Sequence, residues 1–273
     1  MITNIHRYSP IVMTTAAQKI HDELEPLMSN QTAVVDLTIF VSCYNEEVYI
    51  IDTLNTIVGA LDKLTISYEI IIIDDVSSDR SVELIEQYIA EHPQQLIILR
   101  KNPTNKGLAQ NYLDAAFLGK GKYYRLICGD NAEPRESLVK IFSHLGKADM
   151  IVPYYADLSG KSLYRRLVSN TYTYLINSIT GFKLHYYNGL AVHLRYNVMR
   201  WHPNTRGFGF QADILCMLLD EGFTCQEVPV SAVHRKGQDS KALTFKNFLS
   251  VTHTIVDVVI RRLSNWVYQK KNK

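Results

Sequence analysis

The strongest constraint on the fold of this chain is an apolar run, Ile70 to Ile73, that ends in Asp74 and Asp75. Four consecutive isoleucines suit a β-strand buried on both faces, as in a parallel sheet that helices cover on each side. Open α/β sheets bind ligands at the carboxyl ends of their strands, where these two carboxylates would lie. Asp is also common in turns and helix caps, so an isolated Asp pair favours a structural role. The run therefore predicts a buried strand, and further motifs decide between a turn and a ligand site.

Two further motifs follow the ends of predicted strands. A strand over 37–41 leads into Tyr44-Asn45-Glu46, whose ring, amide and carboxylate suit stacking on a base and hydrogen bonding to its edge and ribose. A strand over 95–100 leads into Asn105-Lys106-Gly107, which permits a tight turn into a helix. The amino end of that helix would face the same edge of the sheet, where helix N-termini attract anions. Each motif alone also fits a strand-to-helix turn, with Asn45 as the helix cap.

A strand over 124–128 supplies the last motif, because it ends in Cys128-Gly129-Asp130 shortly before Pro134 at the start of a predicted helix. Strands and helices alternate along the chain, which predicts a doubly wound, mostly parallel sheet. No Gly-, Ser- or Pro-rich linker interrupts the alternation, so we expect one main domain. The remaining predicted elements are helices over 48–61, 81–91, 107–118 and 135–145, and a strand over 150–153.

Composition narrows the class of protein. The 273 residues carry a formal net charge of +2, which argues against nucleic-acid binding by bulk electrostatics. The amino end lacks the apolar core of a signal peptide, and no run of about eighteen apolar residues occurs. We therefore expect a cytoplasmic protein without a transmembrane helix. Four cysteines lack metal-site spacing and are expected to be free thiols in a reducing compartment; they are Cys43, Cys128, Cys216 and Cys225.

Together, the four motifs resemble the nucleotide-sugar domain of family 2 glycosyltransferases, which have the GT-A fold, an α/β fold with a mostly parallel central sheet. The resemblance covers about Val35 to Lys241. It implies an inverting enzyme that takes a sugar from a nucleotide-sugar donor with the help of a divalent metal, Mg²⁺ or Mn²⁺. The residues that the resemblance assigns to the donor are Tyr44, Asn45, Glu46, Asp74, Asp75, Lys106 and Gly107.

Three positions of these motifs depart from the family pattern. Cys128 replaces the first acid of the family's D-x-D motif, Val76 replaces a common Gly, and Ala132 stands where many polyprenyl-phosphate members carry a further polar ligand. Asp130 matches the second acid and would bind the metal, because one carboxylate with waters and phosphate oxygens is an ordinary Mg²⁺ arrangement. Thiolate is a soft donor that matches Mg²⁺ or Mn²⁺ poorly, so Cys128 is not expected to be a ligand. Asn131 or Glu133 would be the alternative source of a second oxygen.

The carboxyl half holds the expected acceptor residues. Arg165 and Ser169 resemble the R-x-x-x-S motif of dolichyl- and polyprenyl-phosphate sugar synthases, and a spacing of four puts them on one helix face as a phosphate clamp. A solvated Arg pair on an amphipathic helix is the alternative. Asp213 matches the family's acid at the head of a helix, and would be a general base, position a phosphate acceptor, or merely favour the helix dipole. His185 stands where the family usually has an Asp. A basic loop, solvated or closing on the diphosphate, contains His234, Arg235 and Lys241.

The predicted parts are a helical extension over 1–34, a GT-A domain over 35–244, and an amphipathic helix with a basic tail over 245–273. Within the domain, 35–134 would bind the nucleotide sugar and 135–244 the acceptor. The last helix would pack on its own domain, on a second subunit of a homo-oligomer, or on an anionic membrane surface. The predicted function is sugar transfer to a polyprenyl phosphate at the cytoplasmic membrane face. The alternatives are a soluble enzyme that acts on a sugar hydroxyl of a cell-surface polysaccharide, and a silent homologue that only binds a nucleotide sugar.

Overall fold

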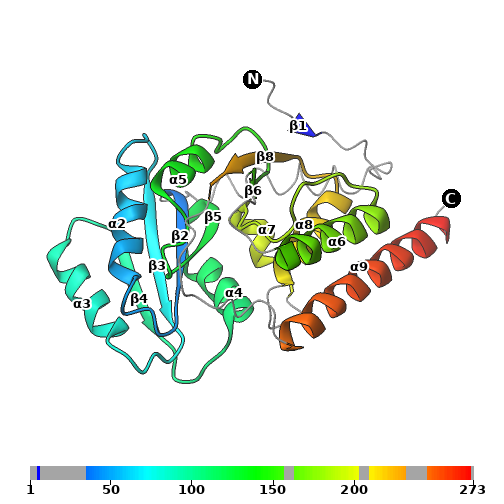
Figure 1. Cartoon of the computed structure of the whole chain (residues 1–273). Helices are drawn as coiled ribbons and strands as arrows, with labels where there is room; N and C mark the ends of the chain where they lie inside the picture. The colour runs from blue at the N-terminus through cyan, green and yellow to red at the C-terminus, as the bar shows by residue number, and fades with distance from the viewer. Residues whose placement is uncertain (1–4, 7–34, 157–162, 203–208, 232–244, 272–273) are drawn as a thin grey trace.

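The computed structural model describes residues 5–6, 35–156, 163–202, 209–231 and 245–271 (Figure 1). Its strands are β1 (Ile5–His6), β2 (Val35–Cys43), β3 (Tyr68–Asp74), β4 (Ile97–Lys101), β5 (Gly121–Cys128), β6 (Met150–Tyr155), β7 (Val192–Leu194) and β8 (Cys225–Val230). Within the described ranges they form one sheet in the order β1-β8-β6-β7-β5-β2-β3-β4. The strands β2 to β5 pair in parallel, as do β6 and β8, whereas β7 and β1 pair antiparallel to their neighbours. The prediction of a mostly parallel sheet is confirmed.

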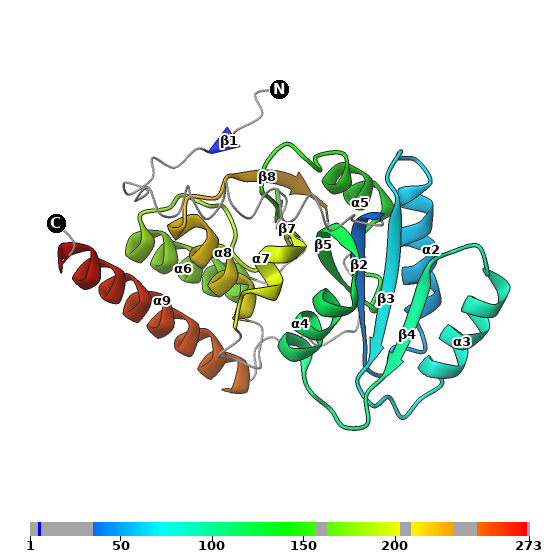
Figure 2. The same cartoon turned by 180° about the vertical axis from the view of Figure 1, so that it is seen from behind.

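Helices cover both faces of this sheet (Figures 1 and 2). One hydrophobic core lies between the sheet and α2, α3 and α5, and a second lies between the sheet and α4, α6, α7 and α8. The helices are α2 (Ile50–Leu61), α3 (Ser81–Glu91), α4 (Leu108–Leu118), α5 (Arg135–Phe142), α6 (Leu163–Thr180), α7 (Arg195–Met199), α8 (Phe210–Asp220) and α9 (Phe245–Lys271).

The isoleucine run divides its side chains between the two cores. Ile71 and Ile73 belong to the core beneath α4 and α8, whereas Ile70 and Ile72 belong to the core beneath α2 and α3. All four side chains are fully buried, and each contributes about 1.5–3 kcal/mol relative to an exposed side chain. The expected double-faced burial is therefore confirmed, and it places Asp74 at the carboxyl edge of the sheet.

The ends of several elements differ from the sequence prediction. The strand expected over 95–100 is Ile97–Lys101, because Leu96 is exposed and its carbonyl accepts a hydrogen bond from Ile70 N at 2.8 Å before the strand begins. The helix expected from residue 48 begins at Ile50, since Val48 is exposed in the preceding turn. The short elements β7 and α7 were not predicted, because three- and five-residue elements carry little periodicity. Of the helical extension expected over 1–34, the structure describes only Ile5–His6, which form the strand β1.

The last helix, α9, packs on its own domain through α8. Arg261 Nη1 lies 2.7 Å from Asp213 Oδ1, and Arg262 Nη1 lies 2.7 Å from Asp220 Oδ1. Val258, one turn before these arginines, is fully buried. Of the three environments expected for this helix, contact with its own domain is thus observed. None of the described helices combines the length and apolar character that crossing a bilayer requires.

Candidate active site

The loops after β2 and β3 are joined by hydrogen bonds. Asn45 Oδ1 accepts a hydrogen bond from Ser78 N at 2.8 Å, and Ser77 Oγ accepts one from Asn45 N at 2.9 Å. Asn45 adopts a φ of +57°, which Asn tolerates better than most residues. The structure therefore brings two motifs together, although they are separated by more than 25 residues in the sequence.

Tyr44 and Glu46 flank Asn45 and face different surroundings. The Tyr44 side chain is 48% exposed, as a ring that stacks on a ligand requires. Glu46 lies against the Cys128-Gly129-Asp130 motif, because a Cβ added at Gly129 would be 3.3 Å from Glu46 Cγ. The first and last motifs of the sequence thus meet at the same sheet edge.

Asp74 is the last residue of β3, and only one of its two carboxylate oxygens accepts a hydrogen bond from the described residues. Its Oδ2 accepts a hydrogen bond from Ser77 N at 3.1 Å. Its Oδ1 is buried and accepts no hydrogen bond from the described part of the chain. A buried acceptor without a donor costs about 1–3 kcal/mol, so a ligand that donates to this oxygen would recover that energy. The role of Asp74 in donor binding stays a prediction.

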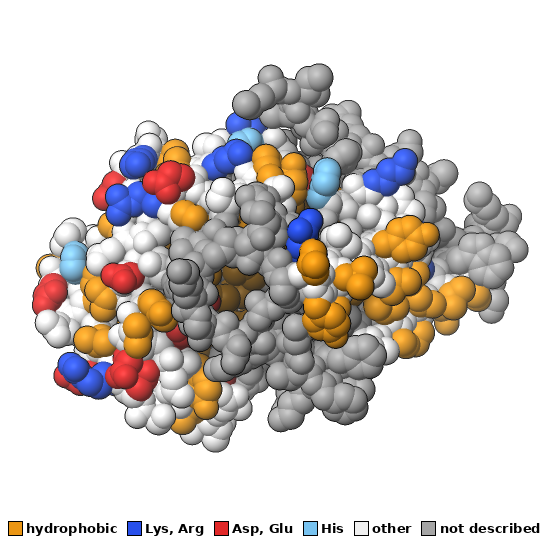
Figure 3. Space-filling view, in the orientation of Figure 1, with side chains coloured by type: hydrophobic (Ala, Val, Ile, Leu, Met, Phe, Trp, Pro, Cys, Tyr) orange, Lys and Arg blue, Asp and Glu red, His pale blue; other side chains and the backbone are white. Residues whose placement is uncertain are grey.

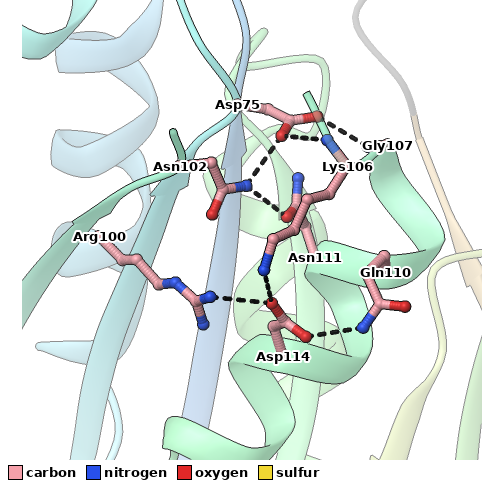
Figure 4. A network of polar contacts seen from close by, with 8 residues as sticks. All are labelled: Asp75, Arg100, Asn102, Lys106, Gly107, Gln110, Asn111 and Asp114. Carbon is pink, nitrogen blue, oxygen red and sulfur yellow. Dashed lines mark hydrogen bonds and ion pairs between the residues drawn. The ribbon is translucent and has the colours of Figure 1, made fainter. Parts of the chain in front are cut away.

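Asp75, by contrast, is bonded by its own protein (Figure 4). Its Oδ1 accepts hydrogen bonds from Asn102 Nδ2 at 2.8 Å and Lys106 N at 2.9 Å, and its Oδ2 accepts one from Gly107 N at 2.9 Å. Burial opposes ionisation of this carboxyl, but the hydrogen bonds outweigh burial and hold its pKa below the ordinary value. Asp75 therefore fixes the amino end of α4, where the helix dipole also favours a negative charge.

The side chain of Lys106 turns away from Asp75 and along α4. Its Nζ donates to Asp114 Oδ2 at 2.8 Å, and Arg100 Nη2 lies 3.1 Å from the same oxygen (Figure 4). Gly107 caps α4 with a φ of +81°, a conformation that other residues rarely adopt. In this arrangement Lys106 and Gly107 shape the turn that the sequence predicted, with the Lys106 ammonium paired to Asp114.

Val76 holds a strained backbone conformation. Its φ is +72°, which is a genuine outlier for a β-branched residue, and its side chain is 43% exposed. The position is the one where the family commonly has Gly, so the loop keeps the shape that Gly would allow at no steric cost. Strain of this kind persists where surrounding contacts fix the backbone, as the bonds from Asn45 to Ser77 and Ser78 do here.

The Cys128-Gly129-Asp130 motif offers one hard oxygen ligand. Burial, with the nearby carboxylates of Asp130 and Glu133, raises the pKa of the Cys128 thiol to about 12, so the thiol stays protonated. Asp130 is partly exposed, and its Oδ1 accepts a hydrogen bond from Ala132 N at 3.2 Å. In the described part of the chain no group of three or more His, Cys, Asp or Glu residues has the arrangement of a metal site. One carboxylate completed by phosphate oxygens and water fits Mg²⁺ or Mn²⁺.

A buried ion pair behind this motif was not predicted from the sequence. Arg125, fully buried in β5, places Nη2 2.5 Å from Glu133 Oε1 and donates from Nε to Leu190 O at 3.0 Å. One oxygen of Glu133 is thus committed to Arg125 rather than to a metal. The signal in the sequence was an arginine inside an otherwise apolar strand, since a buried charge needs a partner.

Asp213 lies in the first turn of α8, as predicted, and both of its carboxylate oxygens are hydrogen-bonded. Oδ2 accepts from Trp201 Nε1 at 2.7 Å and Oδ1 accepts from Arg261 Nη1 at 2.7 Å. The residue is 7% exposed. Gln211, two residues earlier, is buried with neither amide atom hydrogen-bonded in the described structure, and sequence reasoning did not select it.

His185 forms a pair with Glu227 of β8. Its Nδ1 lies 2.8 Å from Glu227 Oε2, and its backbone N donates to Glu227 Oε1 at 2.7 Å. The ring of Tyr154 stacks on the imidazole with centroids 4.5 Å apart. The His185 side chain is 55% exposed, whereas that of Glu227 is 3% exposed. Sequence reasoning noted His185 only as a departure from the family pattern.

The remaining predicted acceptor residues are placed in part. Ser169 lies within α6 and is partly exposed. Arg165 belongs to the same helix, but its side chain lies outside the described part of the structure. His234, Arg235 and Lys241 lie in the segment 232–244, also outside it.

Comparisons with known proteins agree with this geometry. The sequence profile of glycosyl transferase family 2 matches residues 38–200. Dolichyl-phosphate beta-glucosyltransferase of Dictyostelium discoideum is 31% identical over 113 residues, which are 39% of this chain and 35% of that protein. Dodecaprenyl-phosphate galacturonate synthase of Rhizobium johnstonii is 25% identical over 64% of this chain and 51% of its own length. The chain thus spans about a third to a half of these two relatives. Dolichol-phosphate mannosyltransferase of Saccharomyces cerevisiae is 26% identical over 76% of this chain and 81% of its own length.

Solved structures resemble the fold at low sequence identity. A mannosyltransferase from Pyrobaculum calidifontis in complex with GDP-Man and Mn²⁺ aligns over 90% of this chain and 72% of its own, with a TM-score of 0.63 and 14% identity. Glucosyl-3-phosphoglycerate synthase from Mycobacterium tuberculosis, in complex with Mg²⁺ and UDP, aligns over 86% and 83%, with a TM-score of 0.62 and 14% identity. These likenesses show that the chain has the GT-A fold. Because the family profile covers more than half of the residues and all four strand-end motifs, the chain belongs to glycosyl transferase family 2.

Proposed function

We propose that this glycosyltransferase moves a sugar from a nucleotide-sugar donor to a polyprenyl phosphate, with inversion at the anomeric carbon. The donor half of the proposal rests on Asp74, whose buried Oδ1 has no donor in the described structure, and on the exposed ring of Tyr44, which follows Cys43, the residue paired with Asp74 between β2 and β3. A carboxylate and an aromatic ring at one sheet edge suit the hydroxyls and base of a nucleoside. The solved structures of similar fold that hold GDP-Man or UDP support a nucleotide-based donor.

A divalent cation, Mg²⁺ or Mn²⁺, would be held by Asp130. It would neutralise charge on the diphosphate leaving group. The Cys128 thiol is a soft donor and would leave the coordination to oxygen, which these hard ions prefer. The solved relatives contain Mn²⁺ or Mg²⁺, which supports the use of one of these ions.

The observation that carries the acceptor proposal is the apolar surface at the start of α6. Leu163, Tyr164 and Leu167 are 79%, 64% and 66% exposed, and they surround the Arg165 and Ser169 positions along the helix. Figure 3 shows apolar side chains gathered over this side of the molecule. Exposed apolar groups are costly in water unless a partner covers them, and a polyprenyl chain beside a phosphate clamp is such a partner. Three relatives named for dolichyl, dodecaprenyl or dolichol phosphate support this acceptor class.

A sugar hydroxyl of a glycan is the second candidate acceptor. The observation that favours it is the exposed His185 ring beside the buried Glu227, because a hydroxyl needs a proton acceptor in the transition state. A relative named poly(ribitol-phosphate) beta-glucosyltransferase, 26% identical over 50% of this chain, supports keeping this candidate.

Transfer of radiolabelled sugar tests the proposal. A panel of UDP-, GDP- and dTDP-sugars with Mn²⁺, read by thermal shift, selects the donor, and the label is then followed into lipid extract or oligosaccharide. We expect label in lipid, and we expect Arg165→Ala to lower that transfer about 10–100-fold, as loss of a charge-assisted phosphate contact should. Arg166→Ala is the matched control and should change little. Label in oligosaccharide alone, with Arg165→Ala as active as wild type, would favour the hydroxyl acceptor.

A further inference from the structure

The pair formed by His185 and Glu227 has a defined proton arrangement. An ionised carboxylate only accepts hydrogen bonds, so Nδ1 of the neutral imidazole donates to Glu227 Oε2. The proton of the neutral ring therefore sits on Nδ1, and Nε2 carries the lone pair. In the part of the chain that the structure describes, no group hydrogen-bonds to Nε2, and the side chain is 55% exposed. Stacking on Tyr154 fixes the plane of the ring, with an interplanar angle of 14°.

The segment that carries His185 is tied to the sheet edge used by the donor motifs. Strands β5, β6 and β8 run in the same direction, because β7 is antiparallel to both β5 and β6, and β6 is parallel to β8. Tyr154 lies near the carboxyl end of β6, at the same edge as Asp130 after β5. The chain after His185 then passes close to β6 at Gly189. A Cβ atom added at Gly189 would lie only 2.1 Å from Pro153 O, so the two backbones are in close contact there. It then reaches Leu190, whose carbonyl accepts from Arg125 Nε at 3.0 Å.

Arg125 connects this segment to the Cys128-Gly129-Asp130 motif. The same guanidinium pairs with Glu133, three residues after Asp130. Residues 185–190 therefore connect His185 to Leu190, whose carbonyl is bonded to Arg125. Arg125 in turn pairs with Glu133, in the loop that contains Asp130. Asp213, for which general base was one of the expected roles, is 7% exposed and accepts hydrogen bonds from Trp201 and Arg261. Of these two candidate proton acceptors, His185 has the more exposed side chain.

We propose that His185 Nε2 accepts the proton from the attacking oxygen of the acceptor, and that Glu227 is a positioning residue that fixes the imidazole tautomer. The inference rests on the proposed glycosyl transfer and adds the group that takes the proton. In this step the acceptor oxygen forms a bond to the anomeric carbon, and the bond from that carbon to the diphosphate oxygen breaks. The electron pair leaves with the diphosphate, and the proton of the acceptor O–H moves to Nε2.

The nature of the acceptor sets how much this proton transfer matters. A sugar hydroxyl, or a water molecule that hydrolyses the donor, always brings a proton. A phosphate monoester brings one only as the monoanion, because its last proton is lost with a pKa of about 6. The effect of removing His185 is therefore largest for water and for hydroxyl acceptors.

The test compares His185→Gln with wild type in the slow hydrolysis of the donor and in transfer to lipid phosphate and to oligosaccharide. We expect kcat for hydrolysis to fall about 10²–10⁴-fold, as loss of a general base does, while KM for the donor changes less than about twofold. Transfer to lipid phosphate should fall by a smaller factor. Glu227→Gln should lower kcat less than His185→Gln and leave the donor KM unchanged, and ¹⁵N NMR should show that His185 has lost its preference for the Nδ1–H tautomer.

His253→Gln is the matched control, because His253 Nδ1 is also paired with a carboxylate, Asp257 at 3.0 Å, and is 51% exposed on α9. It should keep wild-type kcat. Unchanged hydrolysis by folded, nucleotide-binding His185→Gln would overturn the role of His185. Failure of the wild type to glycosylate lipid phosphate would instead refute the proposed acceptor, and the hydrolysis comparison would still decide the role of His185.

Discussion

Asp74 and Asp75 are adjacent in the sequence, yet the structure predicts opposite effects for their removal. Asp75→Ala deletes the acceptor for three donors, Asn102 Nδ2, Lys106 N and Gly107 N. Each hydrogen bond contributes about 1 kcal/mol net, and the charge at the amino end of α4 adds a few tenths. The free energy of unfolding should therefore fall by about 3 kcal/mol. For a domain of this size, that corresponds to a loss of roughly 6–12 °C in Tm.

Asp74→Ala should cost little stability and much affinity. It removes one bond of 3.1 Å from Ser77 N, while its Oδ1 has no donor in the described structure. The free energy of unfolding should change by less than about 1 kcal/mol. Loss of a hydrogen bond to the nucleoside should weaken nucleotide binding by about 1–3 kcal/mol, which is roughly 5–150-fold in Kd.

Urea unfolding followed by circular dichroism, together with calorimetric titration of UDP and GDP in Mn²⁺, measures both quantities for each variant. Equal losses of stability in the two variants, or wild-type affinity in folded Asp74→Ala, would refute the division of roles. The pH dependence gives a further check. Because the folded-state pKa of Asp75 lies below its ordinary value of 3.8, its stabilisation is full above that value. The stability gap between wild type and Asp75→Asn should therefore be constant near neutral pH and shrink below about pH 4.

Three further variants test separate features. Asp130→Asn should abolish Mn²⁺ binding in the presence of nucleotide, measured by calorimetry, whereas Cys128→Ala should retain it; equal loss in both would assign the thiol a role in the metal site. Val76→Gly should raise the free energy of unfolding by about 1 kcal/mol, because relief of about 1–2 kcal/mol of strain exceeds the entropy cost of Gly, and a lower urea midpoint would contradict the strain. Arg261→Ala should lower the free energy of unfolding by about 2–3 kcal/mol, because it leaves the buried carboxylate of Asp213 without its cation. An unchanged urea midpoint would show that this pair does not stabilise the packing of α9 on α8.

The sheet and its edge were predictable because they depend on local patterns. Four consecutive isoleucines are all buried only when their strand lies between two layers of helices. In such a parallel sheet the motifs that follow the strands meet at one edge because of the topology. Asn45 and the Asp74-Asp75 pair were brought together for this reason. The resemblance to family 2 supplied the roles, and the family profile bears out the family.

The distinction between Asp74 and Asp75 was not predictable, because it depends on which donors a later loop presents. The turn before α4 offers its backbone amides to Asp75 and none to Asp74. Side-chain pairs between separate elements were missed for the same reason. Arg125 with Glu133, and His185 with Glu227, become visible only when separate strands and loops are placed side by side. A buried Arg in a strand showed that a partner must exist, but not which acid it was.

The short strand β7 forms a seam between the two parallel groups of strands. In the described sheet it pairs with β6 only through Met150 and Ile151, and with β5 through residues 123–125. Backbone amides exchange with solvent when a segment opens locally, and briefly paired strands open at lower free energy than long ones. Amides of β7 should therefore take up deuterium faster than those of β2, which is paired on both sides along most of its length. Deuterium uptake at Val192 and His193 would then report local opening of the sheet where its two parallel groups of strands join.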